Sequence, residues 1–119
     1  MLGGRPVKGA SWELAVTVSA VDVTTAVMAK LTPKEIKAVL PSVSQWQKKG
    51  ALIRRTFVFK DFPASVKFVT GVARLAEKAG HHPDIDIRWN KVTLALTTHD
   101  EGGLTEKDFA LAKKFDALA

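Results

Sequence analysis

The stretch HHPDIDIRWNKVTLALTTHD, residues 81–100, contains two runs in which apolar and polar side chains alternate. Residues 84–89 alternate without a break, and residues 92–98 form a second run rich in apolar and β-branched side chains. Alternation with a period of two is typical of a β-strand with one buried face. Because Asn90-Lys91 separates the runs, we predict a tight turn and an antiparallel hairpin. Trp89 continues the apolar face of Ile85 and Ile87, so we expect it to pack in the core.

A long amphipathic helix is predicted directly before this hairpin. Asp61 is a favourable N-cap residue, and Pro63 lies in the first turn, where its missing N–H costs nothing. Gly80 is a natural C-terminal stop for the helix. The stripe predicted to be buried recurs at helical spacing and consists of Phe62, Val66, Val69, Ala73 and Ala76.

Two further helices are marked by capping boxes. Thr32 and Glu35 form the first, with proline at the first helical position, and we expect this helix to end at Leu40 because a second proline follows. Thr105 and Asp108 form a variant of the same motif, with aspartate in place of glutamate. They predict a final helix that runs to the C-terminus.

Residues 46–59 predict two more strands, which turn at Gly50. The order is therefore helix, two strands, helix, two strands, helix. Since adjacent strands joined by tight turns are antiparallel, we predict an α+β fold: a four-stranded antiparallel sheet with three helices packed on one face. We assign residues 31–119 to this domain. Residues 1–30 are an N-terminal extension, either a flexible tail or a short extra strand.

The composition is that of an ordinary globular domain, with 119 residues of which 46% are hydrophobic and 25% charged. There is no cysteine, which excludes disulfides, a cysteine nucleophile and thiolate metal sites. The net charge of +6 is spread over scattered pairs, so we expect no direct nucleic-acid binding. No segment has the ~20 apolar residues of a membrane span. We expect a cytoplasmic protein, with organellar targeting by residues 1–27 as the alternative.

All three histidines of the chain lie between positions 81 and 99. His81 and His82 follow the long helix, and His99 follows the last strand. The open end of the predicted hairpin would bring residue 83 close to residue 98 or 99, so the three imidazoles should meet. An imidazole titrates at about pH 6.5, which suits a group that both gives and takes protons at neutral pH.

Two kinds of chemistry are open to such a cluster. Three histidine nitrogens with an open water position suit zinc. Against zinc, adjacent residues on an extended chain point to opposite sides, and Pro83 favours extended geometry at His82. The second possibility is proton transfer: removing water from a carbon that carries a hydroxyl beside a nitrogen needs an acid for the oxygen and a base for the nitrogen. That reaction requires no metal or redox cofactor.

The chain resembles the pterin-4a-carbinolamine dehydratases over roughly residues 31–117, and the family signature is met at every spacing. The stretches at residues 59–62, 96–100 and 103–105 are also similar to the family. One departure is Lys107, where relatives can carry arginine; lysine keeps the charge but lacks the planar fork of a bidentate contact. The signature positions are Glu77, His81, His82, Pro83, Trp89, His99 and Asp108.

This resemblance implies dehydration of 4a-hydroxytetrahydropterin to quinonoid dihydropterin, in the recycling of a tetrahydrobiopterin-type cofactor. It implies a homodimer or homotetramer that uses no cofactor of its own. His81, His82 and His99 would be the catalytic residues, and Glu77 would orient an imidazole. The pterin substrate would lie against both chain segments, at His81, His82, Pro83, Thr98, His99, Asp100 and Glu101.

Several of these positions also have a purely structural interpretation. Asp108 is explained by its capping box, Glu77 as a solvated helix residue and Pro83 as a helix stop. The family also includes dimerisation partners of a transcription factor and assembly chaperones. A non-enzymatic binding module of the same fold is therefore the alternative function, and the complete histidine set argues for the enzyme.

Overall fold

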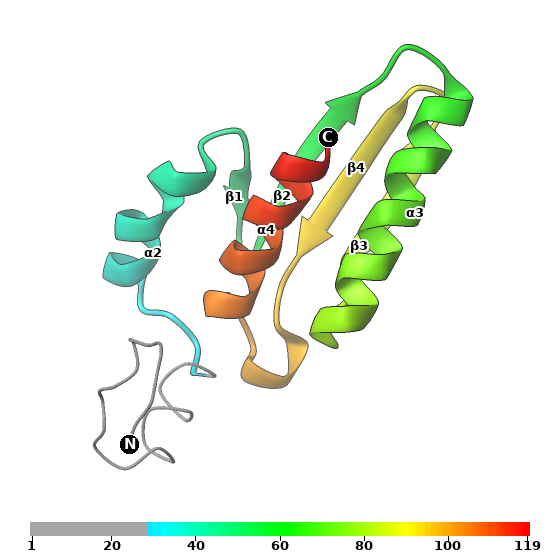
Figure 1. Cartoon of the computed structure of the whole chain (residues 1–119). Coiled ribbons are helices and arrows are strands. Elements are labelled where there is room, and N and C mark those ends of the chain that lie inside the picture. Colours follow the sequence, from blue (N-terminus) through cyan, green and yellow to red (C-terminus); the bar gives the residue numbers. More distant parts are fainter. Residues whose placement is uncertain (1–28) are drawn as a thin grey trace, which may run out of the picture.

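The computed structural model describes residues 29–119, which form a four-stranded antiparallel sheet with helices on one face (Figure 1). The strand order is β1-β2-β4-β3, so the β2–β4 pair joins the two hairpins. The predicted α+β fold and its order of elements are confirmed. The helices and strands are α2 (Pro33–Val39), β1 (Gln47–Lys49), β2 (Leu52–Val58), α3 (Phe62–Ala79), β3 (Asp84–Arg88), β4 (Lys91–Leu96) and α4 (Glu106–Leu118), with two short 3₁₀ turns, η1 (Leu40–Val43) and η2 (His99–Glu101).

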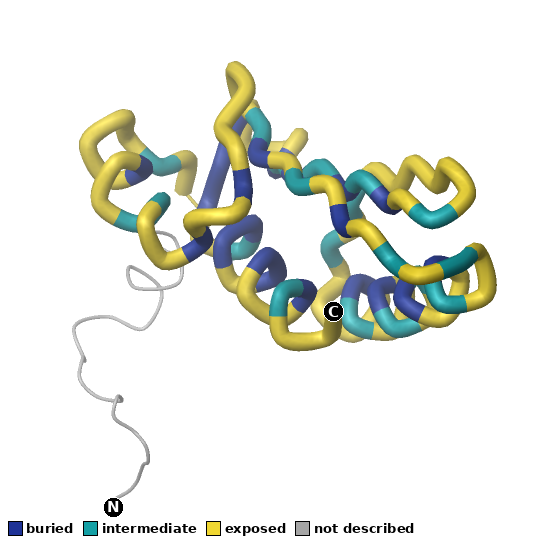
Figure 2. The backbone as a smooth tube through the Cα atoms, turned by 90° about the horizontal axis from the view of Figure 1, so that it is seen from above, coloured by how far each residue is buried: buried dark blue, intermediate teal, exposed yellow. Residues whose placement is uncertain are grey.

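The core lies between the inner face of the sheet and the two longer helices, where the buried positions of Figure 2 gather. Ile53 on β2 and Leu94 on β4 are fully buried at its centre. The long helix α3 contributes Phe68 and Val72, and α4 contributes two phenylalanines, Phe109 and Phe115. Removing this apolar area from water stabilises the fold, at roughly 25 cal/mol per Å² buried.

The predicted helix boundaries depend on local hydrogen bonds, and the structure contains them. The N–H of Glu35 donates to Thr32 Oγ1 at 3.2 Å, and the N–H of Thr32 donates to Glu35 Oε1 at 2.8 Å. Asp61 caps α3 by accepting from the N–H of Ala64 at 2.9 Å. The first helix ends at Val39, one residue early, and the chain continues through the proline as η1. Pro41 fits in the first turn of η1 because the N–H groups of a first turn have no hydrogen-bond partner within the helix, so the N–H that proline lacks is not needed.

The stripe predicted to be buried on α3 was largely wrong. Phe62 and Val66 are 49% and 40% exposed, and of the predicted stripe only Ala76 is buried. The buried positions instead form a neighbouring stripe on the helix: Ser65, Phe68, Val72 and Ala76. The helix thus carries two adjacent apolar stripes, and the sheet covers only one of them.

Trp89 was also predicted wrongly, because it is 68% exposed and lies in the turn of the hairpin. The strand β3 ends at Arg88, and the turn consists of Trp89 and Asn90, one residue earlier than expected. Asn90 fixes this turn by exchanging hydrogen bonds with Phe59: its Nδ2 donates to the Phe59 carbonyl at 2.9 Å, and its own carbonyl accepts from the Phe59 N–H at 2.8 Å. The turn is therefore fixed by a contact to a distant part of the chain.

The flexible tail or extra strand expected for residues 1–30 lies outside the described residues, apart from its last two positions. Within residues 29–119, no helix combines the length and the apolar character that crossing a membrane requires.

Candidate active site

The three histidines meet at a small hollow where α3 and β4 end and β3 begins. Asp84 pairs with Ala95 in the β3–β4 ladder, and the same register places His81 opposite Thr98. The predicted hairpin had residue 83 beside residue 98 or 99, so its register was off by about two residues, but His99 still lies beside the His81-His82 segment. The hollow has a volume of about 240 Å³, and we call it the histidine hollow. It is lined by Gly80, His81, His82, Thr97, Thr98, His99 and Asp100.

Gly80 directs the chain from α3 into this hollow. Its φ of 63° lies in the left-handed region, which glycine adopts without a Cβ clash. The N–H groups of Gly80 and His81 then donate to carbonyls of the last helical turn, at 3.1 Å in each case. The position of the His81 backbone is therefore fixed by the end of the helix.

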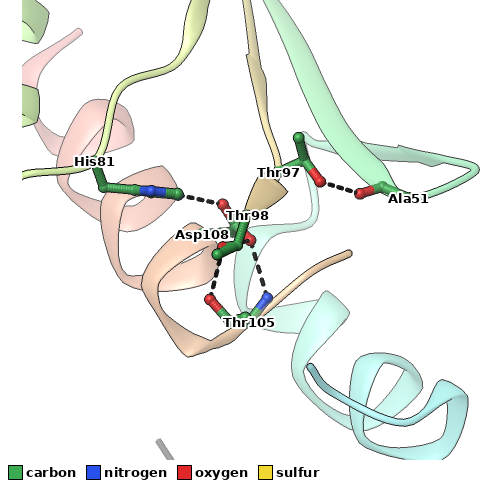
Figure 3. A network of polar contacts seen from close by, with 6 residues as sticks. All are labelled: Ala51, His81, Thr97, Thr98, Thr105 and Asp108. Carbon is green, nitrogen blue, oxygen red and sulfur yellow. Dashed lines mark hydrogen bonds and ion pairs between the residues drawn. The ribbon is translucent and has the colours of Figure 1, made fainter. Parts of the chain in front are cut away.

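The His81 imidazole is held by Asp108, as Figure 3 shows. Its Nε2 lies 2.6 Å from Asp108 Oδ1, and the two side chains are 12% and 0% exposed. A carboxylate only accepts hydrogen bonds, so Nε2 carries the proton and donates it. The Nδ1 atom is then left without a proton and can act as a base.

Asp108 itself is fixed by three hydrogen bonds in all. Its Oδ2 accepts from the Thr98 hydroxyl and from the Thr105 N–H, both at 2.9 Å (Figure 3). The Thr105 and Thr98 hydroxyls are themselves 2.8 Å apart. Because a buried carboxylate is costly without such partners, this complete set explains how Asp108 tolerates full burial. The network joins the end of β4, the start of α4 and the segment after α3.

His82 and Glu77 form a second, solvent-exposed pair. His82 Nε2 lies 2.9 Å from Glu77 Oε1, and their side chains are 63% and 83% exposed. The predicted contact of Glu77 with an imidazole is therefore present, and its partner is His82. Water screens such a pair, so it orients the ring only weakly, with a contribution of about 0–1 kcal/mol.

His99 lies at the opposite wall of the hollow, in η2, and is exposed. Within residues 29–119 its imidazole has no hydrogen-bond or ion-pair partner, so it is available to a bound molecule. The loop that carries it is closed by the Thr98–Gly103 bridge, with N–H···O distances of 3.1 and 3.3 Å. Asp100 lines the hollow, whereas Pro83 and Glu101 lie next to it in sequence and are not part of its lining.

This arrangement suits proton transfer better than metal binding. The described part of the chain, residues 29–119, contains no group of three or more histidine, cysteine, aspartate or glutamate side chains placed to hold a metal ion. The Nε2 atoms of His81 and His82 are bound to two different carboxylates. The hollow contains one imidazole of fixed orientation, that of His81, and two exposed imidazoles, those of His82 and His99. Such a set can donate and accept protons.

Sequence reasoning missed the contact between Asp108 and His81. It explained Asp108 as a cap, and the cap is present, because Oδ2 accepts from the Thr105 N–H. The capping motif uses only Oδ2, so Oδ1 is free to contact His81. That contact depends on how α4 packs beside the end of α3, which the sequence pattern does not show. The available signal was that Asp108 belongs to the same signature as the histidines.

Fold and site together define a class of protein: a small antiparallel sheet backed by helices, with imidazoles from two segments around one hollow. The sequence model of the family named Pterin 4 alpha carbinolamine dehydratase matches residues 29–118. The chain belongs to this family.

Relatives and solved structures agree with this assignment. The chain is 55% identical to a protein of Roseiflexus sp. (strain RS-1) over 75% of this chain and 96% of that one. It is 57% identical to a protein of Chloroflexus aurantiacus (strain ATCC 29366), over 76% and 98%. Both carry the name "Putative pterin-4-alpha-carbinolamine dehydratase".

Two solved structures share the fold. The transcriptional coactivator/pterin dehydratase from Brucella melitensis is 39% identical and superposes with a TM-score of 0.73, over 76% of this chain and 98% of that one. A pterin dehydratase-like protein identified as a RuBisCO assembly factor of the alpha-carboxysome is 29% identical, with a TM-score of 0.52, over 62% and 86%.

Proposed function

We propose that this protein dehydrates 4a-hydroxytetrahydropterin to quinonoid dihydropterin and water, by acid–base catalysis with His81, His82 and His99. Family membership supports the reaction class. The observation that carries the proposal is the His81–Asp108 pair, in which a fully buried carboxylate fixes one imidazole at a hollow shared with His99. A histidine held this way is prepared to take up and release a proton.

The reaction moves two protons and breaks one carbon–oxygen bond. His81 Nδ1 takes the proton from the ring nitrogen beside the hydroxyl-bearing carbon, and Asp108 stabilises the imidazolium. The nitrogen electron pair then forms the C=N bond, and the C–O bond breaks. His99, protonated at the start, gives its proton to the leaving oxygen, which departs as water. Exchange with solvent resets both rings, and no electrons leave or enter the substrate.

The remaining polar groups at the hollow bind the substrate in this proposal. His82, held by Glu77, lies beside His81, with Pro83 next to it. Thr98 and Asp100 belong to the opposite wall, and Glu101 follows in η2. We further propose that the protein recycles a tetrahydrobiopterin-type cofactor in the cytoplasm as a homodimer or homotetramer, without direct binding of nucleic acid.

The test is a stopped-flow measurement on freshly generated carbinolamine at neutral pH. We expect His81→Ala and His99→Ala each to lower turnover about 10- to 1,000-fold, the scale of one lost acid or base. Arg54→Ala, an exposed change on the sheet face without helices, is the control and should keep the wild-type rate. Wild-type turnover in both histidine variants would remove the proposed mechanism.

The second candidate is a binding module without catalysis. It is favoured by the names of the two structural neighbours, one a coactivator and one an assembly factor. The apolar flank that α3 leaves exposed is a suitable surface for such a role. The same stopped-flow measurement separates the candidates, because a pure binding module would not accelerate dehydration above the buffer rate.

A further inference from the structure

Two buried hydroxyl groups lie next to the Asp108 carboxylate (Figure 3). The Thr98 Oγ1 atom lies 2.9 Å from Asp108 Oδ2 and 2.8 Å from Thr105 Oγ1. A buried hydroxyl is costly unless it is hydrogen-bonded, and both hydroxyls meet this need within one small network. That network ends on the carboxylate that holds His81.

The direction of these hydrogen bonds follows from the number of protons. A threonine hydroxyl has one proton to donate, and a carboxylate can only accept. The Thr98 proton therefore points at Asp108 Oδ2. Since that proton is used, Thr98 accepts in its contact with Thr105, and the Thr105 hydroxyl is the donor. The two hydroxyls thus form a directed chain of hydrogen bonds that ends on Oδ2.

This chain determines which carboxylate oxygen faces His81. Oδ2 of Asp108 accepts from the Thr98 hydroxyl and from the Thr105 N–H, both at 2.9 Å. Two donors from different parts of the fold fix the plane of the carboxylate, so that Oδ1 points at His81 Nε2 at 2.6 Å. Aligned hydrogen bonds in a buried site also polarise one another. The orientation of the His81 ring therefore depends on hydroxyls to which the ring itself is not bonded.

We propose that Thr98 and Thr105 are positioning residues of the dehydration site, which act through Asp108 to keep the Nδ1 atom of His81 free as the base. Thr105 is not part of the lining of the histidine hollow, so it acts on a reaction there only through its contacts with Thr98 and Asp108. The effect on turnover rests on the proposed function, whereas the effect of the two hydroxyls on the tautomer of His81 does not.

The backbone of Thr98 closes the loop that carries His99. Its N–H donates to the Gly103 carbonyl at 3.1 Å, and its own carbonyl accepts from the Glu101 and Gly103 N–H groups at 3.1 and 3.3 Å. The polar groups of Thr98 are thus all used within the protein, and its hydroxyl is bound to Asp108 and not left for a substrate. One residue therefore links the wall that holds His81 to the wall that holds His99.

Thr105→Val is the decisive variant, because it keeps the branched shape of the side chain and removes its hydroxyl. We expect turnover to fall about 10- to 100-fold with KM changed less than about threefold, since the outer partners of a functional side chain contribute on this scale. Thr105→Ser restores the hydroxyl and should regain most of the turnover. Wild-type turnover in Thr105→Val, or an equal loss in the valine and serine variants, overturns the proposal.

Thr98→Val tests the next step of the chain and should lower turnover at least as much, because it removes the donor to Oδ2 itself. A rise in KM alone would show that Thr98 binds the substrate directly and would contradict the positioning role.

Thr93→Val is the matched control on the same strand, β4. Its hydroxyl lies 2.8 Å from that of Thr56, and within residues 29–119 neither hydroxyl is hydrogen-bonded to a carboxylate. Thr93→Val therefore removes the same kind of hydroxyl pair without touching the site, and it should keep the wild-type rate. An equal fall in Thr93→Val and Thr98→Val would show a general disturbance of the strand and overturn the proposal.

A measurement without substrate separates this inference from the proposed function. Imidazole ¹⁵N spectra of the wild type should show His81 with its proton on Nε2. In Thr98→Val and Thr105→Val the carboxylate is less firmly held, so the spectra should show a mixture of both tautomers, and Thr105→Ser should keep the Nε2 form. Unchanged spectra in both valine variants overturn the inference. Absence of dehydratase activity in the wild type would instead remove the proposed function, and the spectra would still decide whether the hydroxyls fix the tautomer.

Discussion

Replacing Asp108 by asparagine is the sharpest test of the site, because it changes charge and hydrogen-bond chemistry while keeping size. Asparagine has one acceptor oxygen and one NH₂ group. The oxygen can replace Oδ2 and accept from Thr98 and Thr105, so the start of α4 is retained. The NH₂ group then faces His81 Nε2 at the position of Oδ1. Two donors cannot face each other, so the ring must move its proton to Nδ1.

The expected fall in turnover of Asp108→Asn follows from two changes at His81. The change converts His81 to the wrong tautomer for accepting a proton at Nδ1 and removes the charge that stabilises the imidazolium. Loss of an orienting carboxylate of this kind costs about 100- to 10,000-fold in turnover, or about 2.7–5.5 kcal/mol of transition-state stabilisation. Stability should fall less, by about 1–3 kcal/mol, because a charge-assisted hydrogen bond to His81 is replaced by a weaker one between neutral groups.

Three measurements check this expectation. Stopped-flow kinetics give turnover and KM, urea unfolding gives stability, and ¹⁵N spectra of the imidazoles give the tautomer of His81. Glu77→Gln is the control, since its carboxylate is exposed and its loss should cost less than about 10-fold. If the folded Asp108→Asn protein kept wild-type turnover, or if His81 kept its proton at Nε2, the orienting role of Asp108 would be refuted.

Two further changes test the scaffold. Asp116 Oδ1 accepts from Trp46 Nε1 at 2.8 Å and from Arg55 at 2.7 Å, so Asp116→Ala should lower the free energy of unfolding by about 1–3 kcal/mol, measured in urea, with little effect on turnover. Gly80→Ala forces a Cβ into the left-handed region and should cost about 1 kcal/mol, seen as a fall of about 4–8 °C in Tm. Unchanged stability in either variant would contradict the structure.

Features fixed by neighbours in sequence were predictable, and features fixed by distant contacts were not. The caps at Thr32, Asp61 and Thr105 were found because a capping residue and its partner N–H lie within four positions. The Trp89 turn was misplaced by one residue because Asn90 bonds to Phe59, 31 positions away. Alternation alone contains no information about such a contact.

The choice of the buried stripe on α3 failed for a similar reason. The helix has apolar side chains over more than half its circumference, and pattern alone cannot say which part faces the sheet. The sheet covers Phe68 and Val72 and leaves Phe62 and Val66 exposed.

The convergence of the histidines was predictable from the hairpin, but the division of roles among them was not. A carboxylate fixes an imidazole only when water cannot compete for either partner. Asp108 meets this condition because it is fully buried, and Glu77 does not because it is mostly exposed. His81 is therefore the ring whose orientation is built into the fold, whereas His82 and His99 remain free to adjust to a substrate. The carboxylate that caps α4 through Oδ2 is therefore the same group that sets the tautomer of His81 through Oδ1.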